Sequence, residues 1–91
     1  MKYQVKFTSR FKKDIKVATK QGKNLEKMYE VIDMLASGQA LDASYKDHAL
    51  TGEFEGSREC HIESDWLLVY ALYNDVMVLS LMRLGSHSEL F

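Results

Sequence analysis

The chain has 91 residues, of which 46% are hydrophobic and 27% charged, and its formal net charge is −1. This composition excludes an intrinsically disordered chain, and the length supports one hydrophobic core, so we predict a single domain over residues 1–91. No apolar run approaches the roughly 20 residues of a membrane span, and the N-terminus lacks the apolar segment of a secretory signal. Because Cys60 is the single cysteine, no internal disulfide can form, and we expect a cytoplasmic protein without membrane contacts.

The charges are divided unevenly along the chain. Residues 1–27 contain nine Lys and Arg against two acids, giving +7, whereas residues 28–91 contain three against eleven, giving −8. A basic segment of this kind indicates contact with a polyanion, although a lysine-rich helix face exposed to water has the same composition.

The first third of the sequence predicts a strand followed by two helices. Thr8 or Ser9 can cap the first helix and Asn24 the second, which Gly38 ends, because a side-chain oxygen can accept from unpaired first-turn amides. Two helices separated by two or three residues should form an antiparallel hairpin. The strand alternates apolar and polar residues, with three side chains expected to face inward: Tyr3, Val5 and Phe7.

The second half of the sequence predicts a run of strands. Residues 58–63 alternate apolar and polar positions, and residues 64–65 form a turn. Residues 66–73 are apolar on both faces, as in a central strand, and Asn74-Asp75 indicates a two-residue hairpin turn before a strand over 76–84. The strands are segregated from the helices, so the predicted class is α+β, with the strand and two-helix hairpin packed on a mostly antiparallel twisted sheet.

The C-terminal segment 82–91 combines an arginine, a histidine and a terminal aromatic residue. RNA cleavage without a metal requires a base for the 2′-hydroxyl, an acid for the leaving 5′-oxygen and a cation for the phosphorane charge. We therefore expect the fold to gather the three histidines, one carboxylate and one arginine at this edge. These candidate catalytic residues are His48, His61, Asp65, Arg83 and His87.

Two aromatic residues have alternative interpretations. Phe91 could stack on a splayed base, a contact worth ~1–3 kcal/mol, or it could cover the chain end as an apolar plug. Trp66 heads an apolar strand, and we interpret it as a packing residue.

Other chemistries receive less support from the spacing of residues. Three histidines and a carboxylate could bind zinc, but no HxH, HxxxH or CxxC spacing is present, so we expect no metal and no cofactor. Cys60 lies on the apolar side of its strand, where a cysteine usually packs. Ser86 and Ser88 flank His87, but the G-x-S-x-G sequence of a nucleophile elbow is missing.

Three motifs, in order and spanning essentially the whole chain with the strand–helix–helix start, resemble the YafQ branch of the RelE/ParE toxin superfamily. They are Tyr45-Lys46-Asp47-His48-x-Leu50-x-Gly52, then Gly56-x-Arg58-x-x-His61-x-Glu63-x-Asp65-Trp66-x-Leu68-x-Tyr70, then Arg83-x-Gly85-x-His87-x-x-Leu90-Phe91. The chain departs from the family pattern in having no proline, with Ala49 and Ser64 at two places where relatives often carry one. Both are loop positions, so we expect looser turns and unchanged chemistry.

The resemblance implies a bacterial toxin that enters the ribosomal A site and cuts mRNA, leaving a 2′,3′-cyclic phosphate or its product and a 5′-hydroxyl. It implies an acid/base set of His48, His61, Asp65 and His87, with His87 as the main proton-transfer residue. Arg83 would hold the scissile phosphate, and Phe91 would position a base. Basic side chains of the first helix would grip ribosomal RNA: Lys12, Lys13, Lys16 and Lys20.

The resemblance also implies a cognate antitoxin, whose C-terminal part folds on the toxin while its N-terminal part dimerises and binds operator DNA. The expected assembly is a heterotetramer of two toxins and two antitoxins, and operator DNA is reached only through that complex. Because of the charge division, we expect the antitoxin to cover the basic helices and the catalytic edge.

Two alternatives remain open. A ParE-like toxin would inhibit DNA gyrase by binding and cleave nothing, a mode that does not require the histidine, aspartate and arginine set. A pure interaction module or an inactivated relative would keep the fold without activity. A gyrase supercoiling assay separates the first alternative from a nuclease.

Overall fold

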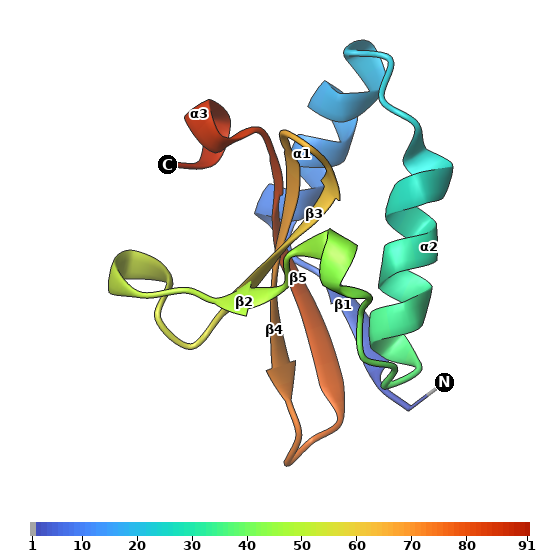
Figure 1. Cartoon of the computed structure of the whole chain (residues 1–91), viewed down its shortest axis with the longest axis vertical. Helices are drawn as coiled ribbons and strands as arrows, with labels where there is room; N and C mark the ends of the chain where they lie inside the picture. Colours follow the sequence, from blue (N-terminus) through green and yellow to red (C-terminus); the bar gives the residue numbers. More distant parts are fainter. Residues whose placement is uncertain (1) are drawn as a thin grey trace.

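A computed structural model describes residues 2–91, in which a mixed sheet carries two long helices on one face (Figure 1). The strand order is β1-β5-β4-β3-β2, with β1 parallel to β5 and every other neighbouring pair antiparallel. The predicted α+β class with a mostly antiparallel sheet is therefore confirmed. The elements are β1 (Gln4–Phe7), α1 (Ser9–Lys20), α2 (Leu25–Ala36), η1 (Ala43–Tyr45), β2 (His48–Ala49), η2 (Gly52–Phe54), β3 (Arg58–Glu63), β4 (Trp66–Tyr73), β5 (Val78–Gly85) and α3 (His87–Leu90).

The two long helices begin where their capping residues predict. The Thr8 hydroxyl accepts from the backbone N–H of Phe11 at 3.2 Å, and the Asn24 side chain accepts from the N–H of Glu26 at 3.1 Å. Gly38, with φ of +80°, follows the end of α2, where a positive φ costs glycine little. The helices run in opposite directions, as expected, but four residues (21–24) separate them, where the sequence had predicted two or three.

Both long helices cover one face of the sheet and form the main core with it. Trp66 is 1% exposed there, which confirms its packing role. The buried members from the helices are Phe11, Ala18, Met28, Val31, Ile32, Leu35 and Ala36, and those from the sheet are Cys60, Ile62, Trp66, Leu68, Tyr70, Leu79, Leu81 and Leu84.

The prediction for Phe7 was wrong, although Tyr3 is buried and Val5 packs against the core as expected. Phe7 is 42% exposed, and its ring lies 5.7 Å from that of Phe11 between centroids. Phe7 is the last residue of β1, where the chain turns into α1, and the contact with Phe11 leaves much of its side chain exposed.

The hairpin between β4 and β5 is also wider than predicted. The turn spans Asn74 to Met77, and β5 begins at Val78 instead of residue 76. A two-residue turn of the favoured type needs positive φ at both central positions, which suits glycine better than Asp75. The wider turn takes its positive φ at Met77 (54°), and Asn74 accepts a hydrogen bond from the Tyr3 hydroxyl.

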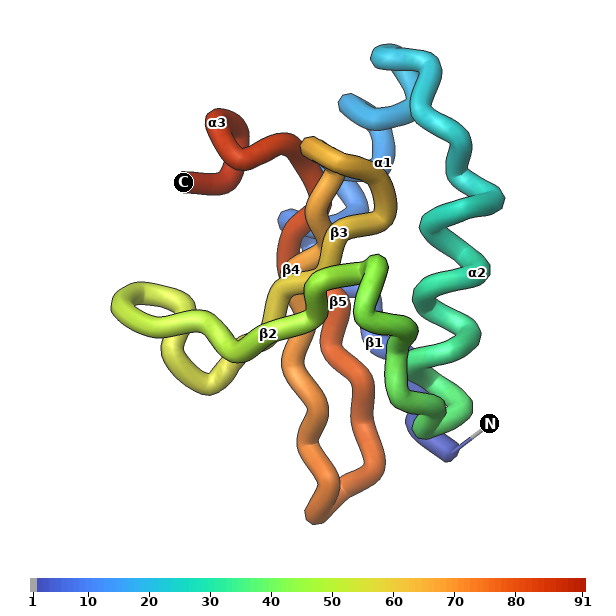
Figure 2. Tube along the Cα trace, viewed as in Figure 1, coloured from blue at the N-terminus to red at the C-terminus, as the bar shows by residue number. Residues whose placement is uncertain are grey.

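The other face of the sheet carries a second, smaller apolar cluster. Figures 1 and 2 show α3 and the loop after β2 on the opposite side of the sheet from α2. The short helix α3 was not predicted from the sequence. The cluster contains Leu50, Phe54, Leu67, Val69, Met82 and Leu90. Within residues 2–91, no helix has the length and apolarity needed to cross a bilayer.

Candidate active site

Strand β3 presents two polar side chains to the face that carries the second cluster. Glu59 and His61 are two positions apart, so they point to the same side, while Cys60 and Ile62 point into the main core. Their cross-strand partners on β4, Val69 and Leu67, belong to the smaller cluster. The candidate site is therefore built on the sheet face opposite the long helices.

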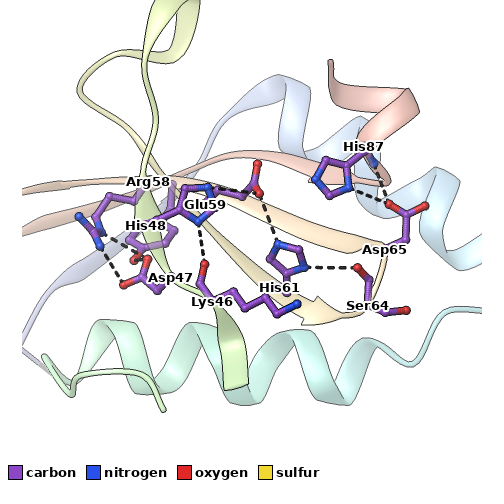
Figure 3. A network of polar contacts seen from close by, with 10 residues as sticks. Lys46, Asp47, His48, Arg58, Glu59, His61, Ser64, Asp65 and His87 are labelled. Carbon is purple, nitrogen blue, oxygen red and sulfur yellow. Dashed lines mark hydrogen bonds and ion pairs between the residues drawn. The ribbon is translucent and has the colours of Figure 1, made fainter. Parts of the chain in front are cut away.

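Glu59 lies at the centre of the site (Figure 3). Its residue is only 3% exposed, and its Oε1 atom lies 3.6 Å from Nε2 of His61 and 3.7 Å from Nε2 of His48. The sequence analysis did not select Glu59. Its position two residues before His61 on an alternating strand was the signal that could have found it.

His48 reaches Glu59 because β2 pairs with β3 in a register that places these two residues opposite each other. The Nδ1 atom of His48 lies 2.7 Å from the backbone carbonyl of Lys46, which has a left-handed φ of 51°. This local turn orients the imidazole so that Nε2 faces the carboxylate.

Asp47, the neighbour of His48, does not contact that histidine. Its carboxylate accepts from Arg58 through Nε and Nη2, both at 3.3 Å, and from the hydroxyl of Tyr70 at 2.6 Å. Asp47 raises the pKa of Arg58, and burial raises the pKa of Tyr70. These bonds hold the segment before β2 against the sheet and thereby position His48.

The tautomers of His48 and His61 follow from their backbone contacts. The Nδ1 atom of His61 lies 3.3 Å from the carbonyl of Ser64, as Nδ1 of His48 lies beside that of Lys46. A carbonyl can only accept, so Nδ1 carries the proton in both rings. Nε2 of each ring then faces the Glu59 carboxylate.

His87, at the start of α3, is oriented by Asp65 from the β3–β4 turn (Figure 3). One oxygen of Asp65 accepts from the backbone N–H of His87 at 3.0 Å and lies 3.1 Å from Nδ1 of its ring. Donation from the backbone and then the ring lowers the pKa of Asp65. As in other carboxylate–histidine pairs, this contact leaves Nε2 of His87 for chemistry.

The sequence-predicted histidines therefore converge. The ring of His87 lies 5.7 Å from that of His61 between centroids. Ligand-type atoms of Glu59, His61 and His87 all lie within 4.8 Å of one another. A proton acceptor and a proton donor can thus stand on either side of one small substrate group.

Phe91 lies beside this cluster and remains accessible. It is 57% exposed, packs edge-on against Phe54 with centroids 5.3 Å apart, and lies 6.2 Å from the His87 ring. The contact with Phe54 fits the apolar-plug interpretation in part. More than half of the residue is exposed, which leaves surface for stacking on a base.

Arg83 is held by an ion pair with Asp14 of α1. Its Nε and Nη2 donate to Asp14 of α1 at 2.9 and 3.4 Å, and Asp14 also accepts from the N–H of Leu84 at 2.9 Å. A register irregularity on β5 precedes Arg83, where Val69 pairs with Arg83 and the next residue of β4 pairs with Leu81. Within the described chain, none of the hydrogen bonds or ion pairs of Arg83 involves the histidines.

The remaining candidates are the single cysteine and the lysines of α1. Cys60 is fully buried, and burial raises the pKa of its thiol to about 12, which supports the packing interpretation over a nucleophilic one. The four lysines proposed to meet ribosomal RNA are all exposed on α1: Lys12, Lys13, Lys16 and Lys20.

A small α+β domain that gathers three imidazoles and a buried carboxylate beside one sheet face belongs to a class of proteins equipped for proton transfer. Residues 3–91 match the family model described as the bacterial toxin of type II toxin–antitoxin system, YafQ. The chain belongs to this family.

Individual relatives agree with the family match. The mRNA interferase toxin YafQ of Escherichia coli K12 is 35% identical over 88 residues, which cover 96% of this chain and 94% of the relative. The metal-bound toxin from Helicobacter pylori superposes with a TM-score of 0.91 at 44% identity, covering 98% of this chain and 99% of the other. YafQ in the E. coli DinJ–YafQ complex superposes with a TM-score of 0.89 at 34% identity, covering 98% of each chain.

Proposed function

We propose that this toxin is an endoribonuclease that cuts mRNA in the ribosomal A site and thereby halts translation. The observation that carries the proposal is the convergence of His48, His61 and His87 around Glu59, with Asp65 orienting His87. One imidazole takes the proton of the 2′-hydroxyl, whose oxygen attacks the phosphorus. A second protonates the leaving 5′-oxygen, so the products are a 2′,3′-cyclic phosphate and a 5′-hydroxyl.

His87 is the leading proton-transfer residue in this proposal, because Asp65 fixes its orientation and its side chain is 57% exposed. His61 and His48, whose Nε2 atoms face Glu59, complete the acid/base set.

Arg83 supplies the cation for the scissile phosphate. Asp14 engages Nε and Nη2 of the guanidinium, and a guanidinium has five N–H donors, so the pair with Asp14 does not use all of the donors that a phosphate oxygen needs. Asp14 then acts as the residue that holds Arg83 in place. Phe91 offers its exposed ring for stacking on a base beside the cut.

Ribosomal RNA is the proposed partner of the exposed face of α1. The lysines there are exposed and lie in the segment of net charge +7. Binding to phosphates of this kind falls as salt rises. The four lysines concerned are Lys12, Lys13, Lys16 and Lys20.

A cognate antitoxin is the proposed restraint on this activity, and the E. coli relative has been solved in the DinJ–YafQ complex. We propose a two-plus-two complex whose antitoxin chain covers the basic helices and the catalytic edge, with operator DNA bound only through the antitoxin. Nuclease assays with a saturating antitoxin test this arrangement. Full cleavage by the saturated complex would contradict it.

Primer extension on mRNA programmed into ribosomes tests the proposed function, with wild type and His87→Ala compared. We expect a new cut within a coding triplet that His87→Ala weakens by about 10²–10⁴-fold, the usual contribution of a positioned acid or base. The matched control is Ser80→Ala on β5, the strand that leads into α3, and this variant should cut normally. Absence of cleavage by folded wild type, together with gyrase inhibition, would favour the ParE-like alternative.

A second candidate function is binding of a transition metal ion at the same cluster. Glu59, His61 and His87 bring their ligand-type atoms within 4.8 Å of one another, although the sequence has no metal-binding spacing. Imidazole with a carboxylate suits copper and zinc, and the H. pylori relative was solved metal-bound. A bound ion would occupy the nitrogen lone pairs needed for proton transfer and so inhibit cleavage.

Calorimetric titration with Cu²⁺ or Zn²⁺ tests this second function directly. We expect a single site that His61→Ala removes, and cleavage that the metal inhibits and EDTA restores. Cleavage that requires the metal would contradict the metal-free mechanism. Absence of binding would contradict the second candidate function.

A further inference from the structure

A pocket of about 650 Å³ lies next to the histidine cluster and takes no part in the proton transfer described above. Three segments meet there: the α1–α2 loop, the β3–β4 turn and the start of α3, which lie at the same end of the molecule in Figure 1. Asp65 belongs to both places, because it lines the pocket and holds His87. An occupant of the pocket would therefore adjoin the site of cleavage.

The pocket walls combine positive, negative and neutral polar groups. Its carboxylates are already engaged: Glu63 pairs with Lys27 at 3.3 Å, and Glu89 accepts from Gln21 at 3.1 Å. Lys23, by contrast, forms no ion pair within residues 2–91, and its ammonium lies 5.9 Å from the centre of the Trp66 ring. The remaining polar walls are Ser64, Ser86 and Ser88.

The charges of these walls select the kind of ligand. Three carboxylates line the pocket, and the two ammonium groups near them are Lys23 and the Lys27 that pairs with Glu63, so the walls keep a net negative charge that disfavours a phosphate group. A nucleobase is neutral, and its edge offers both hydrogen-bond donors and acceptors, which match the hydroxyls, the ammonium and the carboxylate oxygens. The volume lies in the range of small-ligand pockets.

We propose that this pocket binds the base of a nucleotide adjoining the cleaved bond and sets the sequence preference of the toxin. Lys23 and Ser88 are the specificity-determining contacts, since both line the pocket and neither belongs to the catalytic set. The inference rests on the proposed ribonuclease function and adds the recognition of the substrate.

The test measures base selectivity, not the rate alone. Ribosomes are programmed with mRNAs that differ by one base on either side of the cut, and the ratio of cleavage rates for the best and worst base is recorded. We expect Lys23→Gln and Ser88→Ala to reduce this ratio at one position by about fivefold or more, the size of one lost base contact. The matched control Lys6→Gln, an exposed lysine on β1, should keep the wild-type ratio.

Two results would overturn the inference. One is an unchanged ratio in both pocket variants. The other is a uniform loss of cleavage for all four bases that shrinks as salt rises, which would show that Lys23 meets a phosphate.

A binding assay separates this inference from the proposed function. Trp66 is the single tryptophan and lines the pocket, so its fluorescence reports on an occupant. Titration with 2′-deoxy trinucleotides, which cannot be cut through a 2′-hydroxyl, should give base-dependent affinities that Lys23→Gln makes equal. Base-dependent binding without any ribosomal cleavage would refute the proposed function and keep the pocket assignment. Equal affinity for all bases in wild type would refute the pocket assignment.

Discussion

The Oε1 atom of Glu59 lies 3.6 Å from the Nε2 atom of His61, and the Glu59 residue that makes this contact is 3% exposed. A buried carboxylate is costly unless a positive charge or a hydrogen-bond donor satisfies it. The Nδ1 atom of His61 faces the Ser64 carbonyl, which turns Nε2 toward the Glu59 carboxylate. The fold thus places a buried carboxylate beside the imidazoles of the candidate site.

Replacement of Glu59 by glutamine tests the part that this carboxylate plays. Glu59→Gln keeps the shape of the side chain but removes the negative charge that faces the Nε2 atoms of His48 and His61. We expect cleavage in programmed ribosomes to fall about 10²-fold or more. Glu30→Gln on the exposed side of α2 is the control, and wild-type activity in Glu59→Gln would show that the carboxylate has no part in the reaction.

Asp47→Ala should destabilise the protein, because it leaves the buried hydroxyl of Tyr70 and part of the Arg58 guanidinium without their acceptor. The expected loss in the free energy of unfolding is about 1–3 kcal/mol, measured by urea denaturation. Asp75→Ala in the exposed β4–β5 turn should change it by less than about 0.5 kcal/mol. Equal effects of the two variants would contradict the role given to Asp47.

Lowering the pH should break the contacts that Asp65 makes with His87 at the start of α3. The pKa of Asp65 is lower in the folded protein than in the unfolded chain, so its stabilising contribution is fully present above the unfolded pKa. The contribution is then lost as the pH falls through the folded pKa, below the unfolded value of about 3.9. The ¹⁵N chemical shift of the His87 amide should titrate with a midpoint in that acidic window, and Asp65→Asn should abolish the transition. A midpoint above the unfolded value would reverse the sign of this argument.

Cys60 should be inert in the native protein. Its thiol is buried and its pKa is raised to about 12, so almost no thiolate exists at pH 8. A thiol-reactive chromogen should release one equivalent of colour only after guanidinium unfolding. Rapid labelling of the folded toxin, with loss of cleavage, would instead restore the nucleophile interpretation.

The parts of the fold that depend on local signals could be predicted from the sequence. The caps at Thr8 and Asn24 and the alternation along β3 act within a few residues. The helix α3 has a local signal too: Ser86 and Glu89 form a reciprocal capping box. At four residues α3 is too short for the apolar periodicity on which helix prediction rests.

The site depended on contacts between distant parts of the chain. The residue types of the histidine set were visible in the sequence, but the burial of Glu59 depends on how β2, β4 and the second cluster pack around it. The pairing of Arg83 with Asp14 joins residues 69 positions apart, and no local pattern indicates it. The same long-range assembly brings His61 within reach of His87.

The central claim is that imidazole groups activate a ribose 2′-hydroxyl against its neighbouring phosphate. The most direct measurement uses ribosomes programmed with an mRNA that carries a single 2′-deoxy nucleotide on the 5′ side of the cut, with EDTA-treated wild-type toxin. The account predicts cleavage of the all-ribose mRNA to a 2′,3′-cyclic phosphate end and no cleavage at the substituted bond. Cleavage of the 2′-deoxy bond, or a requirement for added metal, would contradict it.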